Sequence, residues 1–145
     1  MAESTESTGT VDVTDLPVFL LDTHALYWHL IDSPRLSAPA AKVFEDAQAG
    51  KAVLIVHYIA LAELYYLLQK HQRSELYPSV LQRLEESGCF RLEAMEFAEV
   101  RDLDNYREIP EMHDRMLVIA AKRLGATLMT RDQSIQSAAR VPYLW

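Results

Sequence analysis

Four short apolar segments, separated by longer stretches with helical periodicity, constrain the fold of this chain more than any other feature. They are Pro17–Leu21, Val53–Val56, Cys89–Leu92 and Thr127–Thr130. Each segment is too short for a helix and is typical of a strand buried on both faces. Strands that alternate with helices need crossover connections, which build a mainly parallel sheet with helices on both faces. The sequence therefore predicts an α/β protein, with Val141–Trp145 as a candidate edge strand.

Seven helices are expected between and after these strands, from the three- and four-residue spacing of apolar residues and from cap residues. Ser37 is a favoured N-cap, and Gly50 and Gly125 are suited to end helices. The expected helices are Thr23–Ile31, Ser37–Ala49, Ile59–His71, Glu75–Ser87, Glu96–Asn105, Met112–Leu124 and Gln133–Ala139.

Residues 1–16 differ in composition from the rest of the chain. Their four acids and many Ser and Thr, without any Lys or Arg, are typical of a disordered tail. We therefore expect a tail at 1–16 and one folded domain at 17–145. The whole chain has 21 acidic and 14 basic residues and a net charge of −7; without the tail, 17 acidic and 14 basic residues leave −3. This charge argues against a nonspecific nucleic-acid binder with a strongly basic body.

The sequence lacks the features of a membrane or exported protein. No apolar run approaches the roughly 20 residues of a membrane-spanning helix, because Asp22, His24 and Glu63 interrupt the most apolar stretches. Residues 1–16 lack the basic start and apolar middle of a secretion signal, so we expect a cytoplasmic protein. The single cysteine, Cys89, permits no internal disulfide.

Four acidic residues fall where a parallel sheet places its ligand site. Asp22 ends the first predicted strand, and Asp132 follows the fourth. Glu63 lies near the start of the helix after the second strand, and Asp114 near the start of the helix before the fourth. Ligands of open parallel sheets bind outside the carboxyl ends of the strands, where the strand order reverses. We therefore expect these four side chains at one rim.

Each acid also has a purely structural interpretation. Asp22 and Asp132 precede predicted helices and are favoured N-caps. Asp114 would complement a helix dipole, and Glu63 would be a solvent-exposed helix residue. Together, however, four carboxylates at one rim repel and raise each other's pKa unless a cation neutralises them. Mg²⁺ and Mn²⁺ prefer oxygen ligands, whereas zinc is disfavoured because the five histidines show no paired ligand spacing.

Four short motifs follow one another along the chain. They are Leu20–Leu26 (LLDTHAL), Ala62–Leu64 (AEL), Pro110–Val118 (PEMHDRMLV) and Leu128–Asp132 (LMTRD). In order and spacing they resemble the motifs of the PIN-domain ribonucleases, especially the VapC-like toxins of bacterial toxin–antitoxin pairs, and the similarity runs from about Val18 to Trp145. The resemblance implies a three-layer α/β/α fold with a central, mainly parallel sheet of four to five strands. One departure is His24, where many members carry Asn or Ser.

The resemblance also implies a site and partners. Asp22, Glu63, Asp114 and Asp132 match the family's acidic quartet, which holds Mg²⁺ or Mn²⁺. Thr130 matches the hydroxyl residue that supports this site. The family pattern further implies cleavage of RNA, a homodimer and inhibition by a cognate antitoxin protein.

A mechanism follows from these ligands. The cation would polarise a phosphodiester oxygen and lower the pKa of a bound water, which attacks phosphorus in line. Asp22, Asp114 and Asp132 are the expected metal ligands, while Glu63 would orient a water or complete a second ion site.

Several neighbouring side chains have a functional and a structural interpretation. Arg115 and Arg131 adjoin members of the quartet and are suited either to hold phosphate or to form structural ion pairs. His113 would contact RNA or, as we favour, serve the start of its helix. The aromatic residues of two predicted helices would stack bases or, as their spacing favours, pack in the core or a dimer. They are Tyr27, Trp28, Tyr65 and Tyr66.

Two alternatives to a toxin nuclease are open at this point. One is a noncatalytic or solitary PIN module that binds RNA or a protein partner, which the complete quartet disfavours. The other is a phosphotransfer domain. A haloacid-dehalogenase-like phosphatase would carry a second Asp two residues after Asp22, where this chain has His24, and a receiver domain would carry adjacent acids there.

Overall fold

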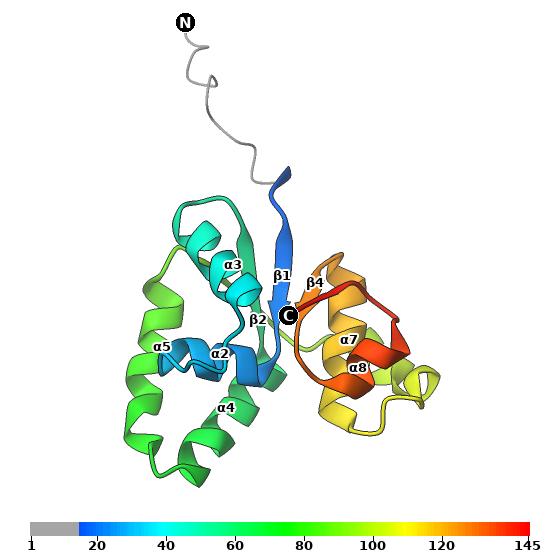
Figure 1. Cartoon of the computed structure of the whole chain (residues 1–145). Coiled ribbons are helices and arrows are strands. Elements are labelled where there is room, and N and C mark those ends of the chain that lie inside the picture. The colour runs from blue at the N-terminus through cyan, green and yellow to red at the C-terminus, as the bar shows by residue number, and fades with distance from the viewer. Residues whose placement is uncertain (1–14) are drawn as a thin grey trace, which may run out of the picture.

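The computed structural model describes residues 15–145, so the tail expected at 1–16 lies, apart from its last two residues, outside the described residues. The elements are, in order, β1 (Val18–Leu21), α2 (Thr23–Leu30), α3 (Ala38–Gln48), β2 (Val53–His57), α4 (Tyr58–Lys70), η2 (Ser74–Leu76), α5 (Tyr77–Glu86), β3 (Phe90–Glu93), α6 (Phe97–Arg101), η3 (Asp102–Tyr106), α7 (Met112–Leu124), β4 (Thr127–Met129), α8 (Gln133–Ala138) and β5 (Tyr143–Leu144). Strands and helices alternate as predicted (Figure 1).

The five strands form one parallel sheet in the order β3-β2-β1-β4-β5. The chain leaves β1 toward β2 and β3 on one side and later crosses to β4 and β5 on the other. The carboxyl ends of β1 and β4 therefore flank the point at which the strand order reverses. The candidate edge strand is confirmed as β5, whose Tyr143 pairs with Leu128.

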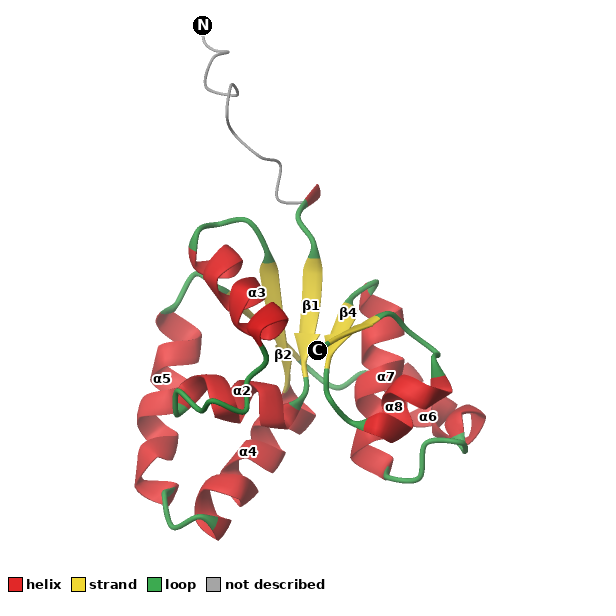
Figure 2. Ribbon diagram, in the orientation of Figure 1, coloured by secondary structure: helices red, strands yellow, loops and turns green. Residues whose placement is uncertain are grey.

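Two hydrophobic cores cover the two faces of the sheet, because successive strand residues point to opposite sides. Leu20, Ile55 and Leu128 face a core built with α7, α8 and η3. Leu21 and Met129 face a second core built with α2, α3 and α5. The sheet lies between these two groups of helices (Figure 2), so the three-layer α/β/α architecture is confirmed.

Two predicted helices are divided in the structure. The helix expected at 75–87 begins as the 3₁₀ turn η2, and α5 starts only at Tyr77. Pro78 lies in the first turn of α5, where its missing N–H would have no helical partner. The helix expected at 96–105 consists of α6 followed by η3. None of the helices in the described part of the chain is long and apolar enough to cross a bilayer.

A hydrogen-bonded cluster around the buried Glu99 side chain fixes the start of α4 relative to α6 and α7. His57 Nε2 lies 2.8 Å from Glu99 Oε1, and both side chains are fully buried. His57 Nδ1 accepts a hydrogen bond from the backbone N–H of Ile59 and thereby caps α4. Arg123 of α7 donates to the other Glu99 oxygen at 2.7 Å. All three helices therefore depend on one carboxylate.

Glu99→Ala should lower the free energy of unfolding by about 1–3 kcal/mol, because it leaves the buried Nε2–H of His57 without its acceptor and removes the nearest carboxylate from Arg123. Urea denaturation measures this loss. The control is Asp104→Ala, which removes an exposed ion pair with Arg107 and should leave the free energy of unfolding nearly unchanged. Equal effects of the two substitutions would contradict the role of the buried cluster.

Candidate active site

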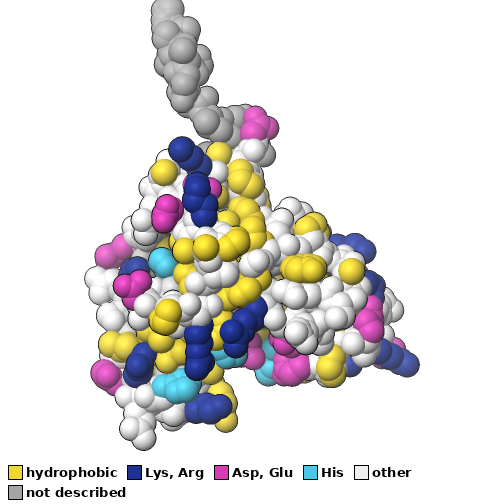
Figure 3. All heavy atoms as spheres, in the orientation of Figure 1, with side chains coloured by type: hydrophobic (Ala, Val, Ile, Leu, Met, Phe, Trp, Pro, Cys, Tyr) yellow, Lys and Arg dark blue, Asp and Glu magenta, His cyan; other side chains and the backbone are white. Residues whose placement is uncertain are grey.

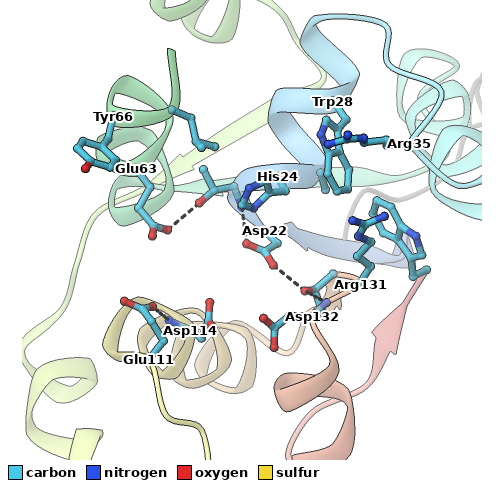
Figure 4. Close-up of a pocket in the computed structure, with 15 residues that line it drawn as sticks. Asp22, His24, Trp28, Arg35, Glu63, Tyr66, Glu111, Asp114, Arg131 and Asp132 are labelled. Carbon is cyan, nitrogen blue, oxygen red and sulfur yellow. Dashed lines mark hydrogen bonds between the residues drawn. The ribbon is translucent and has the colours of Figure 1, made fainter. Parts of the chain in front are cut away.

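A cavity of about 600 Å³ opens at the carboxyl ends of β1 and β4. Its lining comes from α2, α4, the start of α7, the segment after β4 and the last residue of the chain. All four acids of the predicted quartet line it, together with a fifth carboxylate, Glu111. Figure 4 shows these carboxylates converging from separate elements.

Asp22 is the most buried of these acids, with 9% of its surface exposed. One carboxylate oxygen accepts the backbone N–H of Thr23 at 2.6 Å, so Asp22 is the N-cap of α2, as the structural interpretation predicts. The other oxygen accepts a hydrogen bond from Thr130 Oγ1 at 2.6 Å. Burial raises the pKa of Asp22 above its ordinary value, although these two hydrogen bonds act in the opposite direction.

Thr130 connects two acids of the quartet. Its hydroxyl donates to Asp22 and accepts the backbone N–H of Asp132 at 3.0 Å. Asp132 in turn caps α8, because its Oδ1 accepts the backbone N–H of Ile135 at 3.0 Å. The N-cap interpretation of both aspartates is thus confirmed, and it is compatible with their position in the cavity.

Glu63 is half-buried rather than simply exposed, and it faces the cavity from α4. Thr23 Oγ1 donates to Glu63 Oε1 at 2.8 Å, which ties α2 to α4 beside the site. Burial raises the pKa of Glu63, although the hydrogen bond from Thr23 and the charge of His113 act against this. His113 Nδ1 lies 3.5 Å from Glu63 Oε2.

Glu111 is the acid that sequence reasoning missed. It is the N-cap of α7, where its side chain accepts the backbone N–H of Asp114 at 3.1 Å. His113 Nδ1 lies 2.7 Å from its other oxygen, so the favoured helix-start role of His113 agrees with the structure. Glutamate is not a preferred N-cap; the only sequence signal was its place directly before the helix that carries Asp114.

The pKa of Asp114 reflects both its burial and the negative charge of the cavity. Its pKa is raised to about 7, first by burial and then by the charges of Asp22, Asp132, Glu111 and Glu63. Such a set of oxygen donors fits a hard divalent cation, which would remove this repulsion. Within the described residues, the ligand atoms of Glu63, Glu111 and His113 lie within 4.8 Å of one another. The four acids of the predicted quartet line the same cavity, but no three of them bring their ligand atoms within 4.8 Å of one another in the described residues.

The remaining predicted residues occupy different places. Arg131 lines the cavity, with its guanidinium carbon 4.7 Å from the centre of the Trp28 ring. Arg115 is not among the lining residues, and its Nε donates to the carbonyl of Ile109 at 2.6 Å. Tyr27 and Trp28 are buried in the core, as their spacing favours, whereas Tyr65 and Tyr66 are exposed.

A family model of the PIN domain matches residues 19–141. The chain therefore belongs to the PIN-domain family. No curated protein matches it.

Solved structures confirm the fold. VapBC2 from Rickettsia felis, bound to a DNA fragment from their promoter, is 16% identical, with a TM-score of 0.67 over 88% of this chain and 97% of that chain. VapC20 from Mycobacterium tuberculosis, a sarcin-ricin loop cleaving toxin, is 14% identical, with a TM-score of 0.64 over 83% and 95%. A toxin–antitoxin complex from Klebsiella pneumoniae is 18% identical, with a TM-score of 0.59 over 84% and 93%.

The raised pKa of Asp114 predicts an unusual pH dependence of stability. A carboxyl group with a pKa near 7 when folded, and near 3.8 when unfolded, stabilises the metal-free fold below pH 4 and loses that contribution as pH rises to 7. Asp114→Asn should therefore raise the melting temperature at pH 8 and leave it nearly unchanged at pH 4.

Thermal melts with and without Mg²⁺ or Mn²⁺ complete this test. The metal should stabilise wild type more at pH 8 than at pH 5, because binding competes with the proton on the carboxyl group. Asp114→Asn should lose most of this stabilisation. An equal loss of stability at both pH values in metal-free Asp114→Asn would show that repulsion is absent.

Thr130→Val should destabilise the protein by about 1–3 kcal/mol, because it leaves a buried oxygen of Asp22 without its donor. The substitution should also weaken the metal-induced rise in melting temperature. Thr130→Ser keeps the hydroxyl and should restore most of both properties. Thr127→Val, at the start of β4, controls for the loss of a hydroxyl outside the cavity. An equal loss of stability in this control would contradict a specific role for Thr130.

Proposed function

We propose that this protein is a metal-dependent endoribonuclease, the toxin of a toxin–antitoxin pair, that hydrolyses RNA phosphodiester bonds. The observation that carries the proposal is the convergence of Asp22, Glu63, Asp114 and Asp132 on one cavity. Four separate segments supply these acids, and burial, followed by the negative charge of the neighbouring carboxylates, raises the pKa of Asp114. Membership of the PIN-domain family and the likeness to VapC20, a sarcin-ricin loop cleaving toxin, support the same conclusion.

Asp22, Asp114 and Asp132 would hold Mg²⁺ or Mn²⁺, directly or through water. A divalent cation bound there supplies Lewis acidity toward a phosphodiester oxygen and acidifies water. Thr130 fixes the direction of the Asp22 carboxylate through its hydrogen bond. Arg115 positions the segment before α7 by its bond to Ile109.

Glu63 is placed to accept a proton from the attacking water. Its Oε1 accepts the hydroxyl of Thr23, so Oε2, which lies 3.5 Å from His113 Nδ1, is the oxygen that Thr23 leaves available. Burial raises its pKa toward the range in which a carboxylate becomes a stronger base. We therefore assign Glu63 a role distinct from that of the three aspartates, with a second ion site as the alternative role for this carboxylate.

The proposal extends to partners. A cognate antitoxin protein, a homodimer and a cytoplasmic location follow from the toxin class, and the complex from Klebsiella pneumoniae is a similar fold in a toxin–antitoxin pair. The second candidate is a noncatalytic or solitary PIN module that binds RNA or a protein partner. The crowding of five carboxylates disfavours it, since binding alone does not require such repulsion.

Incubation of the purified protein with a mixed RNA pool tests the activity. We expect discrete products with Mg²⁺ or Mn²⁺ and none with EDTA. Asp22→Asn and Asp114→Asn should reduce the rate by more than the roughly 10- to 100-fold typical of residues that only support a ligand. Asp104→Asn, which alters an exposed acid outside the cavity, should cut normally.

Other results have distinct meanings. Cutting that survives in Asp22→Asn would indicate a contaminating nuclease or a different site. Absence of cutting with either metal, in folded protein free of antitoxin, would favour the binding module.

A further inference from the structure

The cavity has two sides of opposite character. Five carboxylates occupy one side, and two arginines with Trp28 occupy the other (Figure 4), where Trp145 packs against Trp28. On the face seen in Figure 3, Lys and Arg side chains gather directly beside Asp and Glu side chains near the centre of the molecule. We name Arg35, Arg131, Trp28 and Trp145 the cationic side.

Trp28 is a rigid platform for Arg131. Only 5% of its surface is exposed, and its ring packs edge-on against Trp145 at 5.7 Å and at a tilt against His24 at 5.4 Å. The guanidinium of Arg131 lies over this ring at 4.7 Å. A cation held over an indole face is attracted by its quadrupole and has few orientations. Arg131 is thus oriented before any ligand arrives.

The arginines of the cationic side differ from most others in the protein. All ten lie in the described part of the chain, and five of them pair with carboxylates: Arg91, Arg101, Arg107, Arg123 and Arg140. Two more donate to a hydroxyl or a carbonyl, namely Arg73 and Arg115, and Arg83 lies outside this cavity. Among the described residues, neither Arg35 nor Arg131 has a carboxylate partner, although both line a cavity with five carboxylates.

Two guanidinium groups without a carboxylate partner in the described part of the chain, beside a candidate cation site, are suited to an anion that spans both sides. A polynucleotide is such a ligand, because consecutive phosphates along the strand can occupy neighbouring sites. Arg131 and Asp132 are consecutive and both line the same cavity, so the two sides can be reached by neighbouring phosphates of one strand. The cavity volume of about 600 Å³ is that of a ligand pocket and not of a groove for a duplex.

We propose that Arg35 and Arg131 together bind a phosphate that neighbours the scissile phosphate on a single-stranded stretch of RNA, with Arg131 held ready by Trp28. This inference rests on the proposed nuclease function and names the substrate form and the residues that position it. Guanidinium forks bind phosphate through two parallel N–H···O bonds, which would set the register of the strand against the carboxylates. Neither residue touches the reacting atoms, so both are positioning residues.

Binding of a short fluorescein-labelled single-stranded RNA of mixed sequence, followed by anisotropy with Mg²⁺, tests the proposal. All proteins carry Asp22→Asn so that the RNA stays intact. Arg35→Gln with Arg131→Gln should weaken binding roughly tenfold or more. The slope of log Kd against log salt should fall by about 0.7 for each phosphate that the protein no longer neutralises.

The matched control is Arg101→Gln with Arg107→Gln, which removes the same charge from two exposed arginines outside the cavity. It should change the affinity little. Equal weakening by both pairs would mean that overall charge alone attracts RNA and would overturn the proposal. No weakening by the Arg35 and Arg131 pair, or equal binding of a duplex of the same sequence, would overturn it as well.

Cleavage by the otherwise wild-type enzyme separates this inference from the proposed function. The Arg35→Gln, Arg131→Gln enzyme should show a raised KM with a smaller change in kcat, and an unchanged metal-induced rise in melting temperature. If this double variant cuts RNA with an unchanged KM, the protein is a nuclease and our inference is wrong. RNA binding that depends on both arginines, without any cutting by wild type, would support the inference and contradict the nuclease.

Single Arg35→Gln guards against misfolding of the double variant. Arg35 is exposed in the loop between α2 and α3, and its replacement removes no ion pair. If the double variant fails to fold, weaker binding by Arg35→Gln alone supports the proposal and unchanged binding overturns it.

Discussion

The hydrogen bond from Thr130 to Asp22 joins the ends of the two central strands on which the site depends. Asp22 is nearly buried, and a carboxylate there is stable only where donors replace water. Thr130 supplies one donor and the backbone of Thr23 the other. With Asp22 fixed in this way, Asp132 lies beside it through the same hydroxyl, and Glu63 is held by the Thr23 side chain. One short polar chain thus orients three of the four acids.

The architecture was predictable because its signals are local and repeat along the chain. Apolar segments such as Val53–Val56 are buried on both faces in the structure, and their shortness and β-branched composition distinguish them from helices. Ser37 and Gly125 mark helix ends by conformational preferences of single residues. The strand order places Asp22 and Asp132 at the switch point by topology, which the alternation of elements already implies.

Features that depend on three-dimensional neighbours were not predictable from the sequence. Glu111 and Arg35 enter the cavity from segments with no periodic pattern, and neither residue type is diagnostic in a loop or at a cap. The separation of Arg115 from the cavity depends on a single bond to the Ile109 carbonyl. The division of the helix at 96–105 likewise accompanies the tertiary partners of Glu99, which lie 24 and 42 residues away in the chain.

Asp22 and Asp132 each line the cavity and cap a helix. This restricts which substitutions can remove their charge without destabilising the fold. A change of either residue to Ala or Val would remove a carboxylate from the cavity and also leave backbone N–H groups at the start of α2 or α8 without an acceptor. Asparagine keeps the cap while it removes the charge. If cells select against the proposed nuclease activity, folded but inactive variants should therefore carry asparagine at these two positions, because residues that cannot cap a helix would also destabilise the chain.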